Sequence, residues 1–391
     1  MSSDPSSHPR RHDLTSPEVA NDLGINLRLG EAMPGLARVI ASRLGAPVAV
    51  ASCAMGLTEW GDPNPLNLLA LGIEPERVER VAQFVGCDPD RLRVGLHGSL
   101  EGGPVRLECP TDPSLGWLAA LQRQPLSLTR RKLCSPCEAD EGDDGMAGRY
   151  ENVSGLHLAT ICLHHGHLLE TRCPRCSQPL TTLDPKTVLT DMTVPMPAMC
   201  DNRMGDGRLC GMDLRDVPML SVDEHDPAVD AATDYRLACY EHISDRIDHL
   251  PIDPATGDRW TAAHATAALA ALVAEPEDIV TGETWLHGAF EAHCRRRWLS
   301  NDDGPLRLKV PSDPAVATCL APDAMAVLDA EPGDLAGVWS PLAERVARRI
   351  SDHPDAAQIE TAFVKALPER FLHTWGIARG SSNPGSSGEV S

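Results

Sequence analysis

The chain has few aromatic residues: its 391 residues include seven Trp, three Tyr and four Phe. A surface that binds single-stranded nucleic acid by base stacking needs several exposed rings in series, so the sequence argues against that class of protein. Basic residues are also outnumbered, with 35 Lys and Arg against 56 Asp and Glu and a net charge of −21. This imbalance disfavours non-specific binding to nucleic acid or to anionic lipid.

Long apolar runs are missing as well. No uninterrupted apolar segment approaches the roughly 18–20 residues that a membrane-spanning helix requires. Residues 1–13 are polar and lack the apolar segment of a secretory signal. We therefore expect a cytoplasmic protein that does not bind membranes. The composition is otherwise ordinary, with 42% hydrophobic and 23% charged residues, and predicts a globular chain of about two to three domains.

The negative charge is concentrated in the second half of the chain. Residues 213–391 contain 30 acidic and 15 basic residues, whereas residues 1–212 contain 26 and 20. If the protein contacts DNA, the contacts should therefore come from the N-terminal half. The acidic half is typical of a solvated scaffold or a protein-binding surface.

Apolar periodicity and breaker residues predict a mainly α protein. We divide it into a disordered tail (1–26), an N-terminal helical region (27–125), a central double zinc-binding module (126–214), a C-terminal helical domain (230–376) and a second disordered tail (377–391). Within the C-terminal domain the pattern predicts helices at Tyr235–Leu250, Trp260–Glu275, Thr284–Leu299 and Leu342–Ile350, and a last one within Gln358–Trp375.

The N-terminal region has the outline of a helix-turn-helix. From Leu27 onward, apolar residues recur near helical spacing and predict a helix that Gly45-Ala46-Pro47 would end; they are Met33, Leu36, Val39, Ile40 and Leu44. Further on, Glu76–Val85 places Val on one face, Gly86-Cys87-Asp88 turns the chain, and Asp88 and Pro89 are suited to begin a second helix that runs to about Leu96. Many helix pairs of this kind read no DNA, so the outline alone does not establish DNA recognition.

Cysteine is abundant and clustered. Of the 13 cysteines, seven lie between Cys134 and Cys210, and the other six are scattered singly. An odd number in a chain without a secretory signal argues against a disulfide framework. We expect the single cysteines to be small buried side chains; they are Cys53, Cys87, Cys109, Cys239, Cys294 and Cys319.

The clustered cysteines have the spacing of zinc ligands. Two C-x-x-C pairs and one C-x-x-H pair occur, followed by two more widely spaced cysteines, and a two-residue spacer lets one tight turn direct two side chains at one ion. Eight ligands are enough for two closed structural zinc sites. The sequential assignment is Cys134, Cys137, Cys162 and His165 for the first site, then Cys173, Cys176, Cys200 and Cys210 for the second. An interleaved assignment is an alternative, and His164 or His167 is an alternative to His165.

Signatures of catalysis are absent from the sequence. There is no H-E-x-x-H motif, no phosphate-binding G-x-x-x-x-G-K-[ST] loop, no G-x-S-x-G elbow and no strand-flanked G-x-G-x-x-G. A catalytic zinc keeps an open position and a nearby carboxylate base, and only Glu170 lies close in the sequence. The acidic run at Asp140, Glu141, Asp143 and Asp144 lacks the ligand spacing of a calcium loop, so we expect a solvated loop. The sequence therefore predicts a protein that is not an enzyme.

These motifs resemble the TniQ family of bacterial transposition proteins, which includes the TnsD-type target selectors. The family's zinc region reads roughly C-P-x-C, C-x-x-H-G-x-x-L and C-P-x-C-G, against Cys134–Cys137, Cys162–Leu169 and Cys173–Ser177 here. The segment Gly30–Ala41 is similar to the family's G-E-S-x-x-S-x-x-x-R-L-A segment. The first knuckle has Ser135 where the family has Pro, and the last has Ser177 where it has Gly. The likeness covers about residues 27–214.

The resemblance implies a non-enzymatic adaptor with two structural zinc ions. Such proteins select a target site, directly or through a guide-RNA complex, and recruit an AAA+ ATPase of the TnsC type; some are homodimers. The alternatives are a zinc-stabilised transcription regulator and, more remotely, a zinc hydrolase. Any phosphate or base contacts should come from the best-placed cations of the N-terminal half, which are Arg91, Arg93, Arg130, Arg131 and Lys132.

Overall fold

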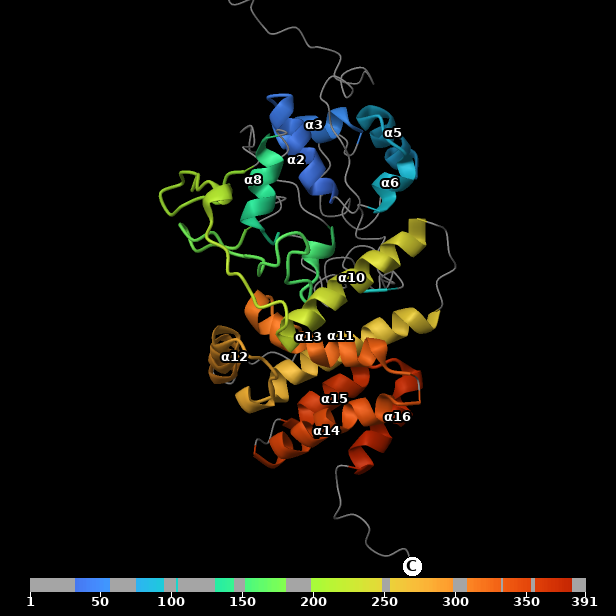
Figure 1. The fold of residues 1–391 in the computed structure, drawn as a ribbon. Helices are drawn as coiled ribbons and strands as arrows, with labels where there is room; N and C mark the ends of the chain where they lie inside the picture. Colours follow the sequence, from blue (N-terminus) through green and yellow to red (C-terminus); the bar gives the residue numbers. More distant parts are fainter. Residues whose placement is uncertain are drawn as a thin grey trace, which may run out of the picture.

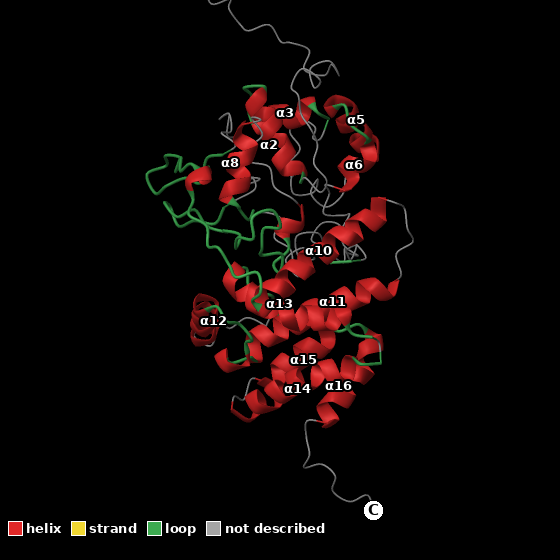
Figure 2. Cartoon of the chain, viewed as in Figure 1, coloured by secondary structure: helices red, strands yellow, loops and turns green. Residues whose placement is uncertain are grey.

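The computed structural model describes residues 32–56, 75–94, 103–104, 131–143, 152–180, 198–247, 254–297, 308–331, 333–352 and 356–381. The described part of the chain is mainly helical, as the sequence predicts, and it contains isolated β-bridges but no strand (Figure 2). Four N-terminal helices lie at one end of the molecule and the C-terminal helices at the other (Figure 1). Irregular loops that carry the clustered cysteines lie between them, on one side.

The N-terminal helices form a small hydrophobic core of their own. They are α2 (Met33–Arg43), α3 (Val48–Ala54), α5 (Pro75–Val85) and α6 (Pro89–Val94). Leu36 and Ile40 of α2 are fully buried in this core beside Val81 of α5 and Leu92 of α6. Within the described residues, no single helix is long and apolar enough to cross a membrane; α2 and α3 pass that test only as a pair bent by 98°.

Helices α5 and α6 have the predicted turn between them. Gly86 adopts a φ of 73°, which costs glycine little and other residues more, and it ends α5. The Asp88 carboxylate accepts a hydrogen bond from the backbone N–H of Asp90 at 2.9 Å, so it caps the start of α6. The described part of the second helix is Pro89–Val94, and it packs against the C-terminal helix α10 (Pro227–Ile247).

The C-terminal half is a bundle of packed helices. After α10 it contains α11 (Pro254–Val273), α12 (Thr284–Arg297), α13 (Pro314–Asp329), α14 (Leu335–Asp352), α15 (Ala356–Ala366) and α16 (Glu369–Ser381). Within the described residues, short 3-10 turns also occur at Asn152–Gly155 and Leu214–Asp216, and at Pro276–Asp278 between α11 and α12. Helix α13 contacts α10, α11, α12 and α14, so it is the centre of the bundle.

Two features of this half differ from the sequence prediction. The central helix α13 was not predicted, because it is buried on most sides and therefore lacks an amphipathic period, and because it contains Pro322. The predicted last helix within Gln358–Trp375 is instead two helices, α15 and α16, which are separated at Leu367-Pro368. Proline favours a helix start and disfavours a helix interior, which explains the break.

The cysteine-rich loops share the core of the C-terminal bundle. Leu158, Ile161 and Leu168 belong to the same buried cluster as α10, α11 and α13. The Oγ1 atoms of Thr160 and Thr318 are 2.7 Å apart, and His157 Nδ1 is 2.9 Å from the carbonyl oxygen of Val310. The cysteine-rich loops therefore pack directly against the C-terminal bundle and share its hydrophobic core.

A buried carboxylate fixes the start of α10. Asp226 is 4% exposed, and its two oxygens cap α10 and hold the loop before α12. They accept hydrogen bonds from the backbone N–H groups of Ala228, Val229, Gly282 and Glu283 and from the hydroxyl of Thr281, at 2.6 to 3.4 Å. Burial opposes ionisation of Asp226, yet these donors hold its pKa below the usual value.

Acid should destabilise this core through its buried histidines. Burial lowers the pKa of His264 to about 3, and burial together with the charge of Lys132 lowers that of His157 to about 3. The unfolded chain binds these protons below about pH 6.5, so stability is retained above that pH and is lost as the pH falls towards 3. We expect the free energy of unfolding to decrease by about 1.4 kcal/mol per pH unit for each histidine between pH 6 and 4.

The measurement is urea unfolding of the protein and of a His264→Phe variant across that range. Acid also displaces metal ions from cysteine ligands, and it does so in both proteins. Only the difference between their pH dependences of unfolding free energy therefore reports the contribution of His264. The unfolding free energy of the variant should fall less steeply, by about the contribution of one histidine. Identical slopes for the two proteins would contradict this account of His264.

Candidate metal centres

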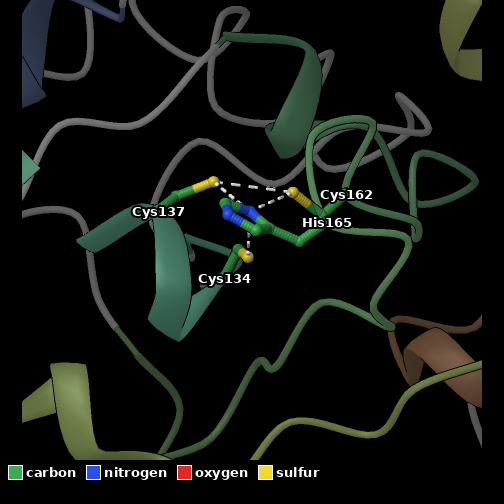
Figure 3. A group of neighbouring side chains, drawn as sticks. All are labelled: Cys134, Cys137, Cys162 and His165. Atoms are coloured by element: carbon green, nitrogen blue, oxygen red, sulfur yellow. Dashed lines mark hydrogen bonds between the residues drawn. The ribbon is translucent and has the colours of Figure 1, made fainter. Parts of the chain in front are cut away.

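The first group of ligands is assembled from the start of one helix and one tight turn. Cys134 immediately precedes α8 (Ser135–Asp143), and Cys137 lies in its first turn. Cys162 and His165 come from a separate turn, and Figure 3 shows the four side chains pointing at one another. His165 Nδ1 lies 3.5, 3.2 and 3.7 Å from the sulfur atoms of Cys134, Cys137 and Cys162, respectively.

The turn at Cys162 depends on a glycine. The Gly166 N–H donates to the carbonyl of Cys162 at 2.9 Å, and the Cys162 N–H donates to the carbonyl of His167 at 2.8 Å. Gly166 has a φ of 59°, the left-handed conformation that closes such a turn. The structure places His165 in the cluster; His164 is exposed, and the His167 ring stacks on that of His165, with centroids 6.2 Å apart.

The second group is assembled from a similar turn and a hairpin-like loop. The sulfur atoms of Cys173 and Cys210 are 3.7 Å apart, and those of Cys176 and Cys200 are 3.9 Å apart. Cys200 and Cys210 face each other across the loop, where the Cys210 N–H donates to the carbonyl of Asn202 and the Gly211 N–H to that of Cys200. Gly207 and Gly211 have positive φ values of 81° and 59° in this loop.

Both groups fit a tetrahedral divalent ion. Within each group all four ligand atoms lie within 4.8 Å of one another. Four thiolates at about 2.3 Å from a zinc-like ion are about 3.8 Å apart, close to the separations found here. The structure thus gathers the eight residues in the sequential assignment, and each group could hold one metal ion. Every position of each tetrahedron is filled by a protein ligand, which is the arrangement of a structural rather than a catalytic site.

The charges of the sulfur atoms also favour a cation. Hydrogen bonds from the Cys134 and Cys137 thiols lower the pKa of Cys162, whereas the nearby Cys134 and Cys162 sulfurs raise the pKa of Cys137. The Cys162 thiol therefore ionises readily, and its negative charge disfavours ionisation of the Cys137 thiol beside it. A divalent ion at the centre removes this repulsion, because each thiolate then binds the ion directly.

Polar neighbours support the thiolates of the second group. The Asn202 side-chain amide donates to the sulfur of Cys176 at 3.5 Å and to the carbonyl of Pro179 at 3.0 Å. Burial opposes ionisation of Cys176, but the backbone N–H of Gln178 and the Asn202 amide donate to the sulfur, and the pKa of the thiol falls to about 7. Sequence reasoning missed Asn202, whose only signal is its position two residues after Cys200.

An ion pair joins the second group to the N-terminal helices. Arg38 of α2 is 2% exposed, and its Nη1 lies 2.5 Å from the Asp201 carboxylate, next to the ligand Cys200. Arg38 belongs to the segment that resembles the family, but its partner Asp201 could not be predicted because it lies more than 160 residues further along the chain. The second group therefore lies in a position to couple its own folding to the docking of α2.

The structure corrects the prediction that Arg131 and Lys132 contact DNA. Arg131 is 3% exposed and pairs with Glu138 at 3.4 Å. Lys132 is 8% exposed, and its Nζ donates to the carbonyls of Leu156, His157 and Ala159, the last two at 3.0 and 2.8 Å. Burial, and the charge of Arg236, lower the pKa of Lys132 well below its usual value. Both side chains hold the cysteine-rich loops together internally.

The other predicted cations remain predictions. Arg91 and Arg93 are exposed on α6, where Arg93 pairs with Asp90, and Arg130 lies outside the described residues. The predicted acidic loop is not a loop throughout, since α8 extends to Asp143. Cys239, Cys294 and Cys319 are buried as expected, Cys53 and Cys87 are half-buried, and Cys109 lies outside the described residues.

The two equivalent turns differ in one residue, which predicts a stability difference. Ser177 has a φ of 56° at the position that Gly166 occupies in the other turn, and its N–H donates to the carbonyl of Cys173 at 2.8 Å. A non-glycine residue in this conformation costs about 1 kcal/mol. Ser177→Gly should therefore raise the free energy of unfolding by about 0.5–1 kcal/mol, and Gly166→Ser should lower it by about 1 kcal/mol.

Denaturant unfolding of the two variants, with metal at a fixed concentration, measures both changes. No atom lies within 4 Å of a Cβ added at Gly166, so a loss there reports the backbone conformation and not a clash. We expect the two substitutions to change the free energy of unfolding in opposite directions. A Ser177→Gly variant that is less stable than the parent would contradict it.

Comparisons of the chain with protein-family models, with curated proteins and with solved structures find no match.

Proposed function

We propose that the chain is a non-enzymatic target-selection adaptor in DNA transposition, which recruits an AAA+ ATPase of the TnsC type to target DNA, directly or through a guide-RNA complex. The proposal starts from the resemblance to the TniQ family. The observation that carries it further is the contact between Arg38 and Asp201. This contact brings the two resembling segments, the one around α2 and the cysteine knuckles, together into one unit.

Within this proposal both ions are Zn²⁺ and both are structural. Thiolate and imidazole ligands in fours at these separations are those that zinc prefers. The two ions hold in place the turns that carry Asp201, the partner of Arg38, and the backbone carbonyls that Lys132 contacts. The free energy of binding such ions contributes directly to folding. The ion supplies no reaction step, and the residues around it hold backbone segments in place.

The acidic helical half supplies the surface for a protein partner in this proposal. Residues 213–391 carry −15 of the chain's net charge of −21, in the segments between the helices rather than on helices α10 to α16 themselves, and this suits a protein partner with a basic surface better than it suits DNA. Target DNA or the guide-RNA complex would then be engaged by the N-terminal helices or the cysteine-rich loops.

The test is reconstitution with neighbouring gene products. The gene for this chain should lie beside genes for an AAA+ ATPase and a transposase, and the purified chain should co-purify with that ATPase. Addition of the chain should direct transposon insertion to one site. Insertion that is equally frequent and equally scattered without the chain would overturn the proposal. Sequence-specific DNA binding without any effect on the ATPase would favour a transcription regulator instead.

A further inference from the structure

A groove of about 380 Å³ lies between the cysteine-rich loops and the C-terminal bundle. Its walls come from two parts of the molecule that Figure 1 shows one above the other, the loops and the helices α12 and α13. The loops contribute residues 168–172 with Pro179 and Leu220, and the bundle contributes Trp285, Ala289 and residues 312–315. Neither group of metal ligands contributes a residue to it, so the groove is separate from both metal centres.

Apolar side chains form much of this groove, and some of them are uncovered. Leu168 and Leu169 are buried. Trp285 is half-buried, and Leu220 is 47% exposed. Apolar side chains of this kind form the centre of a protein interface, where the partner covers them. An occupant that covers Leu220 and Trp285 would gain from the apolar area removed from water.

The charged side chains of the groove are mainly acidic. They are Glu170, Arg172 and Asp313. Arg172 is engaged within its own loop, where its guanidinium donates to the carbonyl of Ser177 at 2.9 Å. One oxygen of Asp313 accepts hydrogen bonds from two backbone N–H groups at the start of α13. Glu170 is half-buried, and among the described residues its carboxylate has neither a hydrogen-bond donor nor an ion-pair partner.

An uncompensated carboxylate in this position favours a cationic occupant. Burial and the nearby charge of Asp313 raise the pKa of Glu170 above its usual value. A half-buried carboxylate without a donor is unfavourable, and two carboxylates in one groove repel each other. The charged head of an arginine or lysine side chain relieves both effects, while its alkyl stem lies along the apolar wall. The half-buried Trp285 ring can add a cation–π contact.

A peptide segment fits the groove better than a lone cation does. Glu170 and Asp313 belong to no group of three or more potential metal ligands within the described part of the chain. A small amine would pair with Glu170 but leave Leu220 in water, whereas a basic residue with an apolar neighbour reaches both. The net charge of −15 over residues 213–391 would also attract a basic segment.

We propose that this groove binds an arginine or lysine residue with apolar neighbours, which belongs to a segment of a protein partner. The inference rests on the proposed function, because it names the surface through which an adaptor would hold such a partner. Pairing with Glu170 is the specific contact, and Leu220 and Trp285 supply the apolar area. The bound segment would contact the cysteine-rich loops and the bundle together, since each forms one wall.

The test measures the fluorescence anisotropy of labelled seven-residue peptides mixed with the full, metal-loaded chain. The probe is Gly-Ser-Leu-Arg-Leu-Ser-Gly. Two companion peptides replace either the arginine by citrulline, its neutral isostere, or both leucines by serine. The variants of the chain are Glu170→Gln, which removes the charge and keeps the shape, Leu220→Ser, and the matched control Glu277→Gln. Glu277 is exposed in the bundle and does not line the groove. Metal content and far-UV circular dichroism establish that each variant is folded.

The arginine peptide should bind the parent with a dissociation constant below about 1 mM, and the citrulline peptide should bind about tenfold more weakly. Glu170→Gln should weaken binding of the arginine peptide about tenfold and remove its advantage over the citrulline peptide, because both changes delete the same contact. Leu220→Ser should weaken both peptides and leave their ratio unchanged. Glu277→Gln should bind the peptides as the parent does.

Equal binding of the arginine and citrulline peptides by the parent would overturn the proposal, as would the absence of binding up to about 1 mM. An arginine preference that persists in Glu170→Gln would place the cation elsewhere on this acidic protein. If the serine-flanked peptide binds as tightly as the leucine-flanked one, the groove is a site for a small cation and not for a protein segment.

This proposal and the adaptor function fail in different ways. If the arginine peptide does not bind but the chain still recruits the ATPase and directs insertion, the groove proposal is overturned and the adaptor function is retained. If the peptide binds through Glu170 but the chain neither binds the ATPase nor alters insertion, the adaptor function is overturned and the groove is retained.

Discussion

A Cys176→Ser variant should lose one of two bound metal ions and, with it, the order of the N-terminal helices. Cys176 is a ligand of the second centre, whose loop carries Asp201, the partner of Arg38 on α2. Loss of a structural zinc removes binding energy on the order of 10 kcal/mol, which is enough to unfold the loops that depend on it. Amide hydrogen exchange should therefore accelerate in residues 198–215 and in α2, while α11 and α13 remain protected.

A Cys137→Ser variant should also lose one ion, but with a different pattern of exchange. The first centre lies next to Thr160 and Leu168, which pack into the core of the C-terminal bundle. Its loss should expose residues 156–168 and the surfaces of α10 and α13 that they cover. Cys53→Ser is the matched control, because Cys53 is half-buried on α3 and belongs to neither group. Identical exchange patterns for the two ligand variants would contradict the assignment of two separate centres.

Lys132→Met should destabilise the protein without any effect that depends on DNA. The substitution keeps an unbranched side chain, one heavy atom shorter, but removes the Nζ group that three buried carbonyls share. Buried carbonyls without a donor cost about 1–3 kcal/mol each, so we expect a loss of about 3 kcal/mol in the free energy of unfolding.

Urea unfolding of Lys132→Met and of Lys365→Met makes this comparison. Lys365 is exposed near the end of α15, and its substitution should change stability by less than about 0.5 kcal/mol. If Lys132→Met unfolds like the parent and instead weakens DNA binding, the side chain is a phosphate contact after all and its internal role is refuted.

The sequence was most informative where chemistry fixes the spacing. A C-x-x-C or C-x-x-H turn must direct two side chains at one point, so six of the eight candidate ligands could be identified from their spacing. Spacing left open an interleaved assignment and the choice between His165 and its neighbours; the structure gathers the ligands in the sequential assignment, with His165. The turn between α5 and α6 was equally predictable, because Gly86, Asp88 and Pro89 each have a strong local preference. These features depend on residues that are close together in the chain.

Features that depend on distant residues could not be predicted. Helix α13 lacks a polar face because α10, α11, α12 and α14 surround it, and that environment is invisible in its own sequence. The role of Lys132 is set by carbonyls that lie 24 to 27 residues further along the chain. A lysine beside two arginines was interpreted as a basic surface, since an exposed position is the usual one for such a residue.

Native mass spectrometry of the purified protein measures whether the chain folds around two separate closed metal centres. We expect a folded chain that carries two zinc ions, of which one is lost in Cys137→Ser and the other in Cys176→Ser. A folded chain that carries one ion or none, with a compact charge-state distribution unchanged by chelator, would contradict it.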